Sequence, residues 1–580
     1  MEISALPDHQ DLLLTGKNVL NETVLDKYRL AGQISQTALK YIISLIHDSY
    51  HLGKTSPPLT PVELCLLGDS YLYTALSSVY QKSVTEKGIA QPVSIDVNDV
   101  AVGVSPEIGT TAEKINRAFV PGDIVKISLG AHVDGYTANV SHTIVIYPPS
   151  TDASEPKPSG PLLGSKADAI CAAYIATEAA ISLLGCALSP EKLPGAYAGR
   201  GKVTGQMLRE VVDGIAKSFG CVVAPGSKIR RLRRFLAGQA ENIVAEKDFK
   251  GVIWSEAHQE FAMLQKSQKL NSEQSALVSV DNHQNFNKLG VSESSAIPTD
   301  NFVVVAGEVY SVDIRMASVS RFEAAGLVTL QNIDEFSGKN NSKDDIVAKS
   351  DVYIRDFAMN YTLKLKSSRS LLSRVEKTSS VYPFKLAHYA DSFPIKTTLS
   401  VDEQRSLLDQ VRKDINKQKL GLSECVNNHL IVAKKMHLAK FLPLDVILNS
   451  SNENARNSGA DLTLMHNTLP GFEVPLPKLG ITHLKLRSLI KHAEPIDVAR
   501  ESATVVLDNF DNEKRVVRLT GSTKFFPANW VHSDFKLQDE TTEALIKLTQ
   551  DQRFGIKVKE CQPMKLTDIK GAAGDQMALD

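Results

Sequence analysis

The sequence predicts an α+β fold that is built from antiparallel hairpins. Asp134 and Gly135 stand between two strand-like runs, and this dipeptide is a strong signal for a two-residue hairpin turn. A second hairpin is predicted at 502–521, where two Val-rich runs flank a polar turn. The segments between the hairpins lack the regular strand–helix alternation of a parallel sheet.

Helices and strands follow one another along the N-terminal half. A helix is predicted at 22–50 from apolar residues at helical spacing: Leu25, Tyr28, Ala31, Ile34, Ala38, Ile42 and Leu45. A second helix, at 61–86, starts with Pro61 in its first turn and Glu63 close behind. Strand-like runs occupy about 92–146, and the Pro-rich segment 147–161 is predicted to be a loop.

The C-terminal half returns to strands after further helices. Helices are predicted at 165–190 and 204–218, a strand run at 301–318, and a mostly helical, basic region at 366–460. These patterns predict five parts: an N-terminal extension (1–21), a core (22–365) with loop insertions near 147–163 and 265–300, a helical basic insertion (366–495) with a flexible loop near 449–461, C-terminal strands that complete the core (496–555), and a flexible tail (556–580).

Composition narrows the class of protein. A chain of 580 residues is too long for one simple core, so two or three packed units are expected. The net charge of −1 produces no general attraction to nucleic acid or membrane, and any nucleic-acid contact must come from local basic patches. The six cysteines lack paired spacing, which argues against a zinc site or a disulfide framework.

The same composition favours an intracellular protein. The first twenty residues lack the basic and apolar regions of a secretory signal, and we find no run of about 18 apolar residues that would span a membrane. We therefore expect a protein of the nucleus, the cytoplasm or both, with no membrane partner.

The first hairpin has the geometry of a metal site without its charges. With Asp134–Gly135 as the turn, Ser128 faces Ser141 and Asn139 faces Gly130, so Ser128 and Asn139 are diagonal neighbours on one face. Two carboxylates so placed would bridge a pair of divalent ions and generate a hydroxide nucleophile. Ser and Asn are weak, uncharged ligands for such ions.

The segment "VKISLGAHVDGYTANVSHT" (125–143) closely resembles the corresponding hairpin of the methionine aminopeptidase superfamily, with "GEVYSVDI", "LKLKSSRSLLSRVEK" and "GLSECVNNHL" agreeing in family order. The resemblance is closest to the non-catalytic branch of proliferation-associated, ErbB-receptor-binding proteins. Length and loops resemble a fungal member catalogued as a probable metalloprotease, which accompanies the pre-60S ribosomal particle out of the nucleus. The resemblance implies a pita-bread fold with antiparallel curved sheets covered by helices, plus a mostly helical insertion.

The resemblance also implies where a family active site would fall. The two metal-ligating Asp fall on Ser128 and Asn139, the ligand His on Ile229, the first Glu on Asp313 and the second Glu on Ser502, while a register slip of one would substitute Glu501. The substrate-facing His falls on Gly103. At best two of the five ligands remain, so we expect no catalytic residues, no bound metal and no cofactor.

Three basic clusters are candidates for binding RNA through its phosphates. The first is "KIRRLRRF" (Lys228, Arg230, Arg231, Arg233, Arg234), whose arginines would spread around a helix; a solvated helix face with acidic neighbours is the alternative. The others lie in the insertion: Lys364, Lys366, Arg369, Arg374, Arg412, Lys413, Lys417 and Lys419, and then Lys434, Lys435, Lys440, Lys485, Arg487 and Lys491.

The resemblance supplies a function for such surfaces. It implies a non-enzymatic ribosome biogenesis factor that binds rRNA and ribosomal proteins around the polypeptide tunnel exit of the pre-60S subunit, together with other assembly factors. Shuttling from nucleus to cytoplasm would use contacts with FG-repeat nucleoporins, which an apolar pocket left at the vanished peptidase site could accept. Two alternatives stay open: an active metallo-aminopeptidase with atypical ligands, and a nucleic-acid-binding regulator acting away from ribosomes.

Overall fold

The computed structural model describes residues 16–564, apart from 81–83, 85, 110–114, 149–159, 236–248, 257, 260–299, 324, 334–348, 445, 447–488, 511–513, 523, 528–529 and 552. The predicted loops near 265–299 and 449–461, with Lys485 and Arg487, fall outside the described residues.

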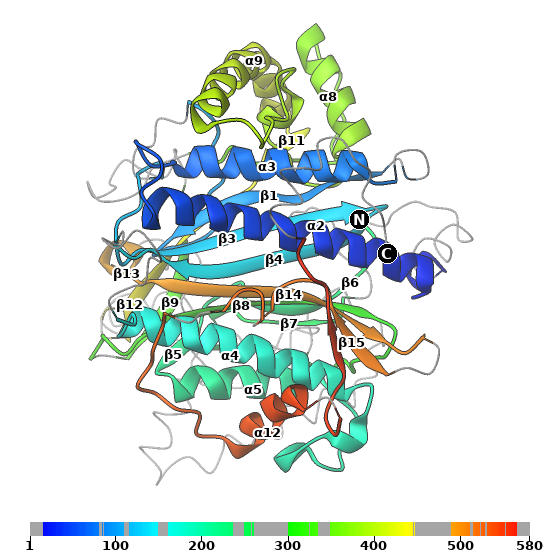
Figure 1. Ribbon diagram of the computed structural model, residues 1–580, viewed down its shortest axis with the longest axis vertical. Coiled ribbons are helices and arrows are strands. Elements are labelled where there is room, and N and C mark those ends of the chain that lie inside the picture. Colours follow the sequence, from blue (N-terminus) through cyan, green and yellow to red (C-terminus); the bar gives the residue numbers. More distant parts are fainter. Residues whose placement is uncertain are drawn as a thin grey trace, which may run out of the picture.

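One large sheet organises the molecule (Figure 1). Its central order is β1 (Lys87–Val97), β3 (Ile124–Val133), β4 (Tyr136–Val145), β14 (Val498–Asp508), β8 (Val309–Ser318), β6 (Lys228–Leu232) and β7 (Gly251–Ile253). Three strands attach at its side: β5 (Cys221–Val223) on β8, β15 (Arg515–Arg518) on β14, and β16 (Val558–Glu560) on β15. All these pairs are antiparallel except β15–β16, so the predicted α+β class is confirmed.

The predicted hairpin register is confirmed. Ser128 lies opposite Ser141, and Gly130 lies opposite Asn139. The turn residues Asp134 and Gly135 both have positive φ, of 55° and 79°, as a two-residue turn that matches the strand twist requires.

Helices cover one face of the sheet in two groups, in front of it in Figure 1. α2 (Glu22–Ile46) and α3 (Pro61–Ser78) pack on β1, β3 and β4. α4 (Ser165–Cys186) packs on β8 and β14, with α5 (Gly205–Ser218) and α12 (Glu540–Gln550) beside it. Each group buries its own hydrophobic core, because the helices present apolar stripes to the inner face of different strands.

The two halves meet at a narrow seam between β4 and β14. Both strands are fully described, and they pair in backbone register at one position, Ser141 opposite Ser502. The side chain of Thr504 extends the seam, donating to the carbonyl oxygen of Asn139 at 3.0 Å. The positions expected for the ancestral site therefore lie at the junction of the two halves.

A second, four-stranded sheet changes the predicted limits of the insertion. It joins β2 (Val100–Val102), β9 (Gly326–Ile333) and β13 (Glu494–Pro495) to β12 (Met436–Pro443). Because β12 pairs with core strands, the predicted insertion 366–495 returns to the core by residue 436.

The helical part of the insertion forms a lobe at the top of Figure 1. It contains α8 (Lys366–Thr378) and α9 (Val401–Asn427), with β10 (Tyr353–Arg355) pairing with β11 (Ile431–Ala433) at its base. We call residues 353–433 the lobe. Among the described residues of the predicted 366–460 region, α8 and α9 are the long helices, and β11 and β12 follow them.

Buried charges fasten the lobe to the core. The Lys385 ammonium is fully buried, donates to the carbonyl oxygen of Pro106 at 3.1 Å and lies 3.7 Å from the Asp69 carboxylate of α3. The same carboxylate lies 3.2 Å from Nε2 of His388. Glu107 accepts a hydrogen bond from the backbone N–H of Ala387 at 2.9 Å. These contacts fix the orientation of the lobe.

Several predicted boundaries shift. The first helix ends at Ile46 and continues as a π-helical turn (His47–His51), and the second ends at Ser78 rather than 86. The predicted tail from 556 contributes strand β16. Short 3-10 turns complete the described elements: Gly16–Asn18, Pro190–Lys192, Gly195–Tyr197, Leu386–Tyr389 and Ile490–His492.

Helix α4 corrects the expectation that no segment is apolar enough for a membrane. It is long and apolar enough by composition, with 78% of its most apolar window buried. Its apolar character follows from its position between the sheet, α5 and α12, because a helix enclosed on most sides has no wide polar face.

The close approach of α2 to Leu519 yields a first prediction. A Cβ at Gly32 would lie 2.6 Å from the carbonyl oxygen of Leu519, whereas a Cβ at Gly214 in α5 meets nothing within 4 Å. Gly32→Ala is expected to lower the free energy of unfolding by about 1–3 kcal/mol through overpacking. The matched variant Gly214→Ala is expected to raise it by about 0.5–1 kcal/mol, because alanine favours the helix. Urea unfolding measures both; stabilisation by Gly32→Ala would contradict the packing.

Candidate functional site

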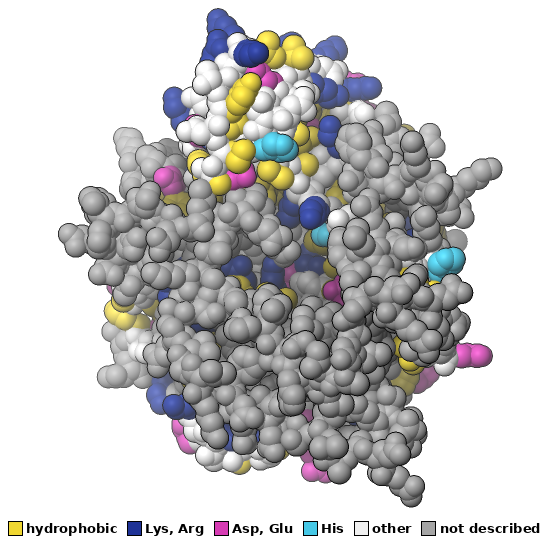
Figure 2. Space-filling view, turned by 180° about the vertical axis from the view of Figure 1, so that it is seen from behind, with side chains coloured by type: hydrophobic (Ala, Val, Ile, Leu, Met, Phe, Trp, Pro, Cys, Tyr) yellow, Lys and Arg dark blue, Asp and Glu magenta, His cyan; other side chains and the backbone are white. Residues whose placement is uncertain are grey.

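The predicted site residues that do share a face lie on the side of the sheet opposite helices α2 to α5. Ser128, Ser141, Ser502 and Asp313 follow one another across β3, β4, β14 and β8. Figure 2 looks onto this side, and Lys and Arg side chains gather in the hollow at its centre. The register therefore brings together the positions at which the resemblance places ligands from four strands.

A guanidinium group stands at the centre of these positions. Arg500 donates from Nε to Asp313 Oδ1 at 2.7 Å and from Nη2 to Oδ2 at 2.9 Å, a bidentate pair. Its Nη1 donates to Ser128 Oγ at 3.2 Å, and that oxygen lies 2.7 Å from Ser141 Oγ. Arg315 adds a further bond to Asp313 Oδ2 at 3.2 Å. Both oxygens of the retained carboxylate are thus engaged by arginine.

The charge state of Asp313 follows from these partners. The carboxylate is 4% exposed, and burial by itself would raise its pKa. Arg500 and Arg315 outweigh that effect and hold the pKa well below its ordinary value, so the group is ionised at neutral pH. A carboxylate neutralised in this way has little negative potential left to attract a dication.

The donor set does not fit a pair of divalent ions. Ser128, Asn139 and Ser502 are uncharged, and Asp313 already binds two cationic side chains. Within the part of the chain that the structure describes, no group of three or more His, Cys, Asp or Glu residues is placed to hold a metal ion. Hydroxyl and guanidinium hydrogen-bond donors occupy the positions where hard cations need anionic oxygen.

Ile229, the position predicted for the ligand His, and Glu501, the alternative to Ser502, both point away from the site, for a shared reason. Ile229 pairs with Val312 and points into the core beneath α4 and α5, whereas its neighbour Lys228 lies opposite Asp313. Glu501 also points away from the site, where its carboxylate meets His142 Nδ1 at 3.0 Å and accepts from the backbone N–H of Thr143 at 3.0 Å. Side chains alternate across a strand, so an error of one residue reverses the face.

Gly103 leaves no room for a side chain. Its φ is +104°, and a Cβ there would lie 2.8 Å from the carbonyl oxygen of Lys435. Together with the charged cluster around Asp313, this contradicts an apolar pocket at the predicted positions. The predicted positions therefore hold polar contacts and not an apolar cavity.

The first basic cluster is a strand, and its side chains separate. Lys228 and Arg230 face the Asp313 side of β6, while Arg231 on the other face is 3% exposed and pairs with Glu308 at 3.1 Å. Arg234 is bound to Asp134 at 2.5 Å. The predicted helix is therefore wrong here. Arg233 lies beyond the end of β6.

The cations of the lobe are more accessible. On α8 and the segment before it, Lys364, Lys366 and Arg369 are exposed, and on α9 Arg412 and Lys413 are exposed. Lys435 is exposed between β11 and β12, whereas Lys434 is partly buried. RNA binding by these residues stays a prediction.

The sequence reasoning missed Arg500 and Arg315. Each lies two residues from a position that it considered, Arg500 from Ser502 and Arg315 from Asp313. Residues two apart on a strand share a face, so alternation places Arg500 on the face of Ser502 and Arg315 on the face of Asp313.

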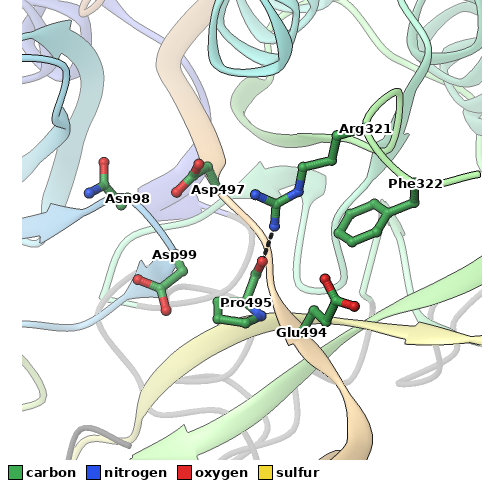
Figure 3. Close-up of a pocket in the computed structure, with 7 residues that line it drawn as sticks. All are labelled: Asn98, Asp99, Arg321, Phe322, Glu494, Pro495 and Asp497. Atoms are coloured by element: carbon green, nitrogen blue, oxygen red, sulfur yellow. Dashed lines mark hydrogen bonds between the residues drawn. The ribbon is translucent and has the colours of Figure 1, made fainter. Parts of the chain in front are cut away.

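A separate cavity of about 530 Å³ lies where β1 meets β2, near the start of β14 (Figure 3). Its lining includes Asp99, Asp497 and Glu494, with Arg321 donating to the carbonyl oxygen of Pro495. The adjacent Lys126 donates to the carbonyl oxygen of Asn98 at 2.6 Å; burial lowers the pKa of this lysine to about 8 against the attraction of neighbouring aspartates. Charges of both signs meet here, so the cavity favours no single class of ligand.

Removing the central guanidinium should destabilise the fold. Arg500→Met leaves Asp313 buried without its bidentate partner, and the free energy of unfolding is expected to fall by about 3–5 kcal/mol. Adding Asp313→Leu should recover part of the loss, although Arg315 then lacks its carboxylate. The control Arg553→Met, at an exposed pair, should change stability by less than about 0.5 kcal/mol. Urea unfolding decides, and equal stabilities for Arg500→Met and Arg553→Met would refute the role of Arg500.

The same carboxylate predicts an acid dependence. Because the folded-state pKa of Asp313 lies below the ordinary 3.8, its stabilising contribution is full above pH about 4 and is lost as pH falls toward the folded value. The stability difference between wild type and Asp313→Asn should therefore shrink as pH falls below about 4, by at most about 1.4 kcal/mol per pH unit. Asp534→Asn, at a side chain that is 98% exposed, should leave the profile unchanged. A difference that grows on acidification would reverse the assigned sign.

Comparison with known proteins identifies the family. No family model matches the chain. It is 52% identical over 586 residues to "Probable metalloprotease ARX1" of Debaryomyces hansenii, covering 100% of both chains, and 45% identical to the protein of that name in Saccharomyces cerevisiae, covering 98% of both. A solved thermophilic Arx1 shares the fold, with a TM-score of 0.51 at 17% identity over 91% of this chain and 98% of that one. The chain belongs to the Arx1 family.

Proposed function

We propose that this protein is a non-enzymatic factor of large ribosomal subunit biogenesis that accompanies the precursor particle from nucleus to cytoplasm. The observation that carries the non-enzymatic part is the bidentate Arg500–Asp313 pair among the positions of the former ligands. The chain belongs to the Arx1 family, and the ribosomal part is supported by the resemblance of the sequence to the fungal member that accompanies the pre-60S particle.

Peptide hydrolysis in this superfamily requires a metal-bound hydroxide, and here the residues that would generate one are replaced. Binding of two dications would require Arg500 and Arg315 to leave Asp313. The charge of the dications would then have to be neutralised beside Ser128 and Ser502, which are uncharged. Both changes are unfavourable, since each leaves charge uncompensated in a buried place. A fold that keeps its shape without its reaction serves best as a binding scaffold.

The partners we propose are rRNA and ribosomal proteins around the tunnel exit, other pre-60S assembly factors and, for passage through the nuclear pore, FG-repeat nucleoporins. Support for an RNA contact comes from the exposed cations Arg412 and Lys413 on α9 of the lobe. Phosphate contacts of this kind need no base recognition and suit the shape-directed binding of structured RNA.

Sedimentation of the protein with ribosomal precursors tests the proposal. In sucrose gradients of cell extract, wild type should co-migrate with free 60S-sized particles, and Arg412→Glu with Lys413→Glu should reduce the bound fraction by roughly tenfold, because lost phosphate contacts weaken binding. The matched reversal Lys547→Glu with Arg553→Glu, on and just after α12 and far from the lobe, should not change it.

Two results would contradict the proposal. Wild type that stays at the top of the gradient while binding RNA would favour a regulator acting away from ribosomes. Turnover of Met-initiated peptides with added manganese or cobalt, abolished by Asp313→Ala, would establish a metallo-aminopeptidase.

A further inference from the structure

Large apolar side chains are exposed together on the lobe. Thirteen such side chains are exposed in the described chain, and four of them fall within nine consecutive residues. These are Phe357 (49%), Met359 (40%), Tyr361 (47%) and Leu365 (37%); Leu420 on α9 (66%) is a fifth on the same lobe. We call these five side chains the apolar strip. Such clustering marks an interaction surface, whereas single exposed apolar residues carry no such meaning.

The segment that carries the strip is held firmly at both ends. At its start, Arg355 donates from Nη1 to the carbonyl oxygens of Met359 at 3.2 Å and Leu430 at 3.1 Å, and its Nε pairs with Glu376 at 3.0 Å. At its end, the Glu424 carboxylate accepts from the backbone N–H groups of Lys364 at 2.7 Å and Leu365 at 3.1 Å. A surface fixed in this way loses little conformational entropy when a partner binds.

The same contacts join the strip to α9. Glu424 lies one helical turn after Leu420, so both residues are on one side of α9. Because Glu424 binds the backbone of Leu365, this side of α9 faces the end of the segment. The strip is therefore one surface that runs from the turn at Phe357 to α9.

Positive charge borders the strip. Residues 356–378 contain five Lys or Arg and two Asp or Glu, and Lys364, Lys366 and Arg369 are exposed next to Leu365. Figure 2 shows hydrophobic side chains at the top of the molecule, with Lys and Arg side chains around them. The surface therefore combines apolar contact area with an attraction for anions.

We propose that the apolar strip docks an extended segment of a partner protein in which acidic residues alternate with large apolar ones. Burial of the strip supplies the driving force, and the lysines and Arg369 select the acidic residues. A protein segment fits better than RNA, because Met359, Leu365 and Leu420 give bases nothing to stack on. The Arg355 guanidinium lies over the ring of Phe357, 5.1 Å from the ring centre, so that face of the ring is not available to a base. This inference goes beyond the proposed function, which requires no such partner.

Fluorescence anisotropy with the full-length protein tests it. The probes are a labelled 12-residue peptide of alternating Glu and Phe or Leu, the same peptide with Lys in place of Glu, and a 12-nucleotide single-stranded RNA. The acidic peptide is expected to bind at least tenfold more tightly than either of the others. Phe357→Ser with Tyr361→Ser should weaken that binding at least tenfold, while Phe554→Ser with Val120→Ser, also at exposed positions, should not.

A second double variant tests the contribution of positive charge to binding. Lys366→Glu with Arg369→Glu should also weaken the acidic peptide at least tenfold and remove its salt dependence. An unchanged thermal midpoint confirms that each variant is folded. Equal affinity for the acidic and basic peptides, tightest binding by RNA, no binding of the acidic peptide at roughly 100 μM, or full affinity after Phe357→Ser with Tyr361→Ser would each overturn the proposal.

Discussion

The bidentate salt bridge between Arg500 and Asp313 is the interaction on which the rest of this structure depends. Arg500 extends from β14 to β8 through Asp313 and to β3 through Ser128, so one side chain links both halves of the large sheet. The backbone supplies little at this place, because β4 and β14, both fully described, pair in register at a single position. The guanidinium of Arg500 thus joins the two sides of the seam through Asp313 and Ser128. Bridging metal ions would join the same strands in a di-metal enzyme.

The electrical character of this centre is opposite to that of a metal site. A di-metal hydrolytic site gathers acceptors around cations, whereas here donors gather around one carboxylate. Arginine suits this position because its planar fork matches a carboxylate and stays charged when buried. The lobe, away from this centre, carries exposed cations and the apolar strip.

The sequence was sufficient for local geometry and insufficient for long-range pairing. Asp134–Gly135 determines a hairpin register through turn chemistry alone, so Ser128 and Asn139 were placed correctly on one face. Arg500 and Asp313 are 187 residues apart, and their contact depends on the β14–β8 register, which no local signal encodes. The placement of Ile229 at the site was wrong because the sequence did not define where the short strand β6 begins. The first residue of a strand determines which face each later side chain takes. The helix expected at 228–234 was wrong because a high density of charged residues indicates neither helix nor strand.

The buried attachment of the lobe has a mechanical consequence. Lys385 has no route to water, and its ties to Asp69 and Pro106 resist swinging of the lobe about its base strands. The lobe is therefore held at a fixed distance and angle from the large sheet. A partner that reached both surfaces at once would gain a second contact without a second loss of translational freedom.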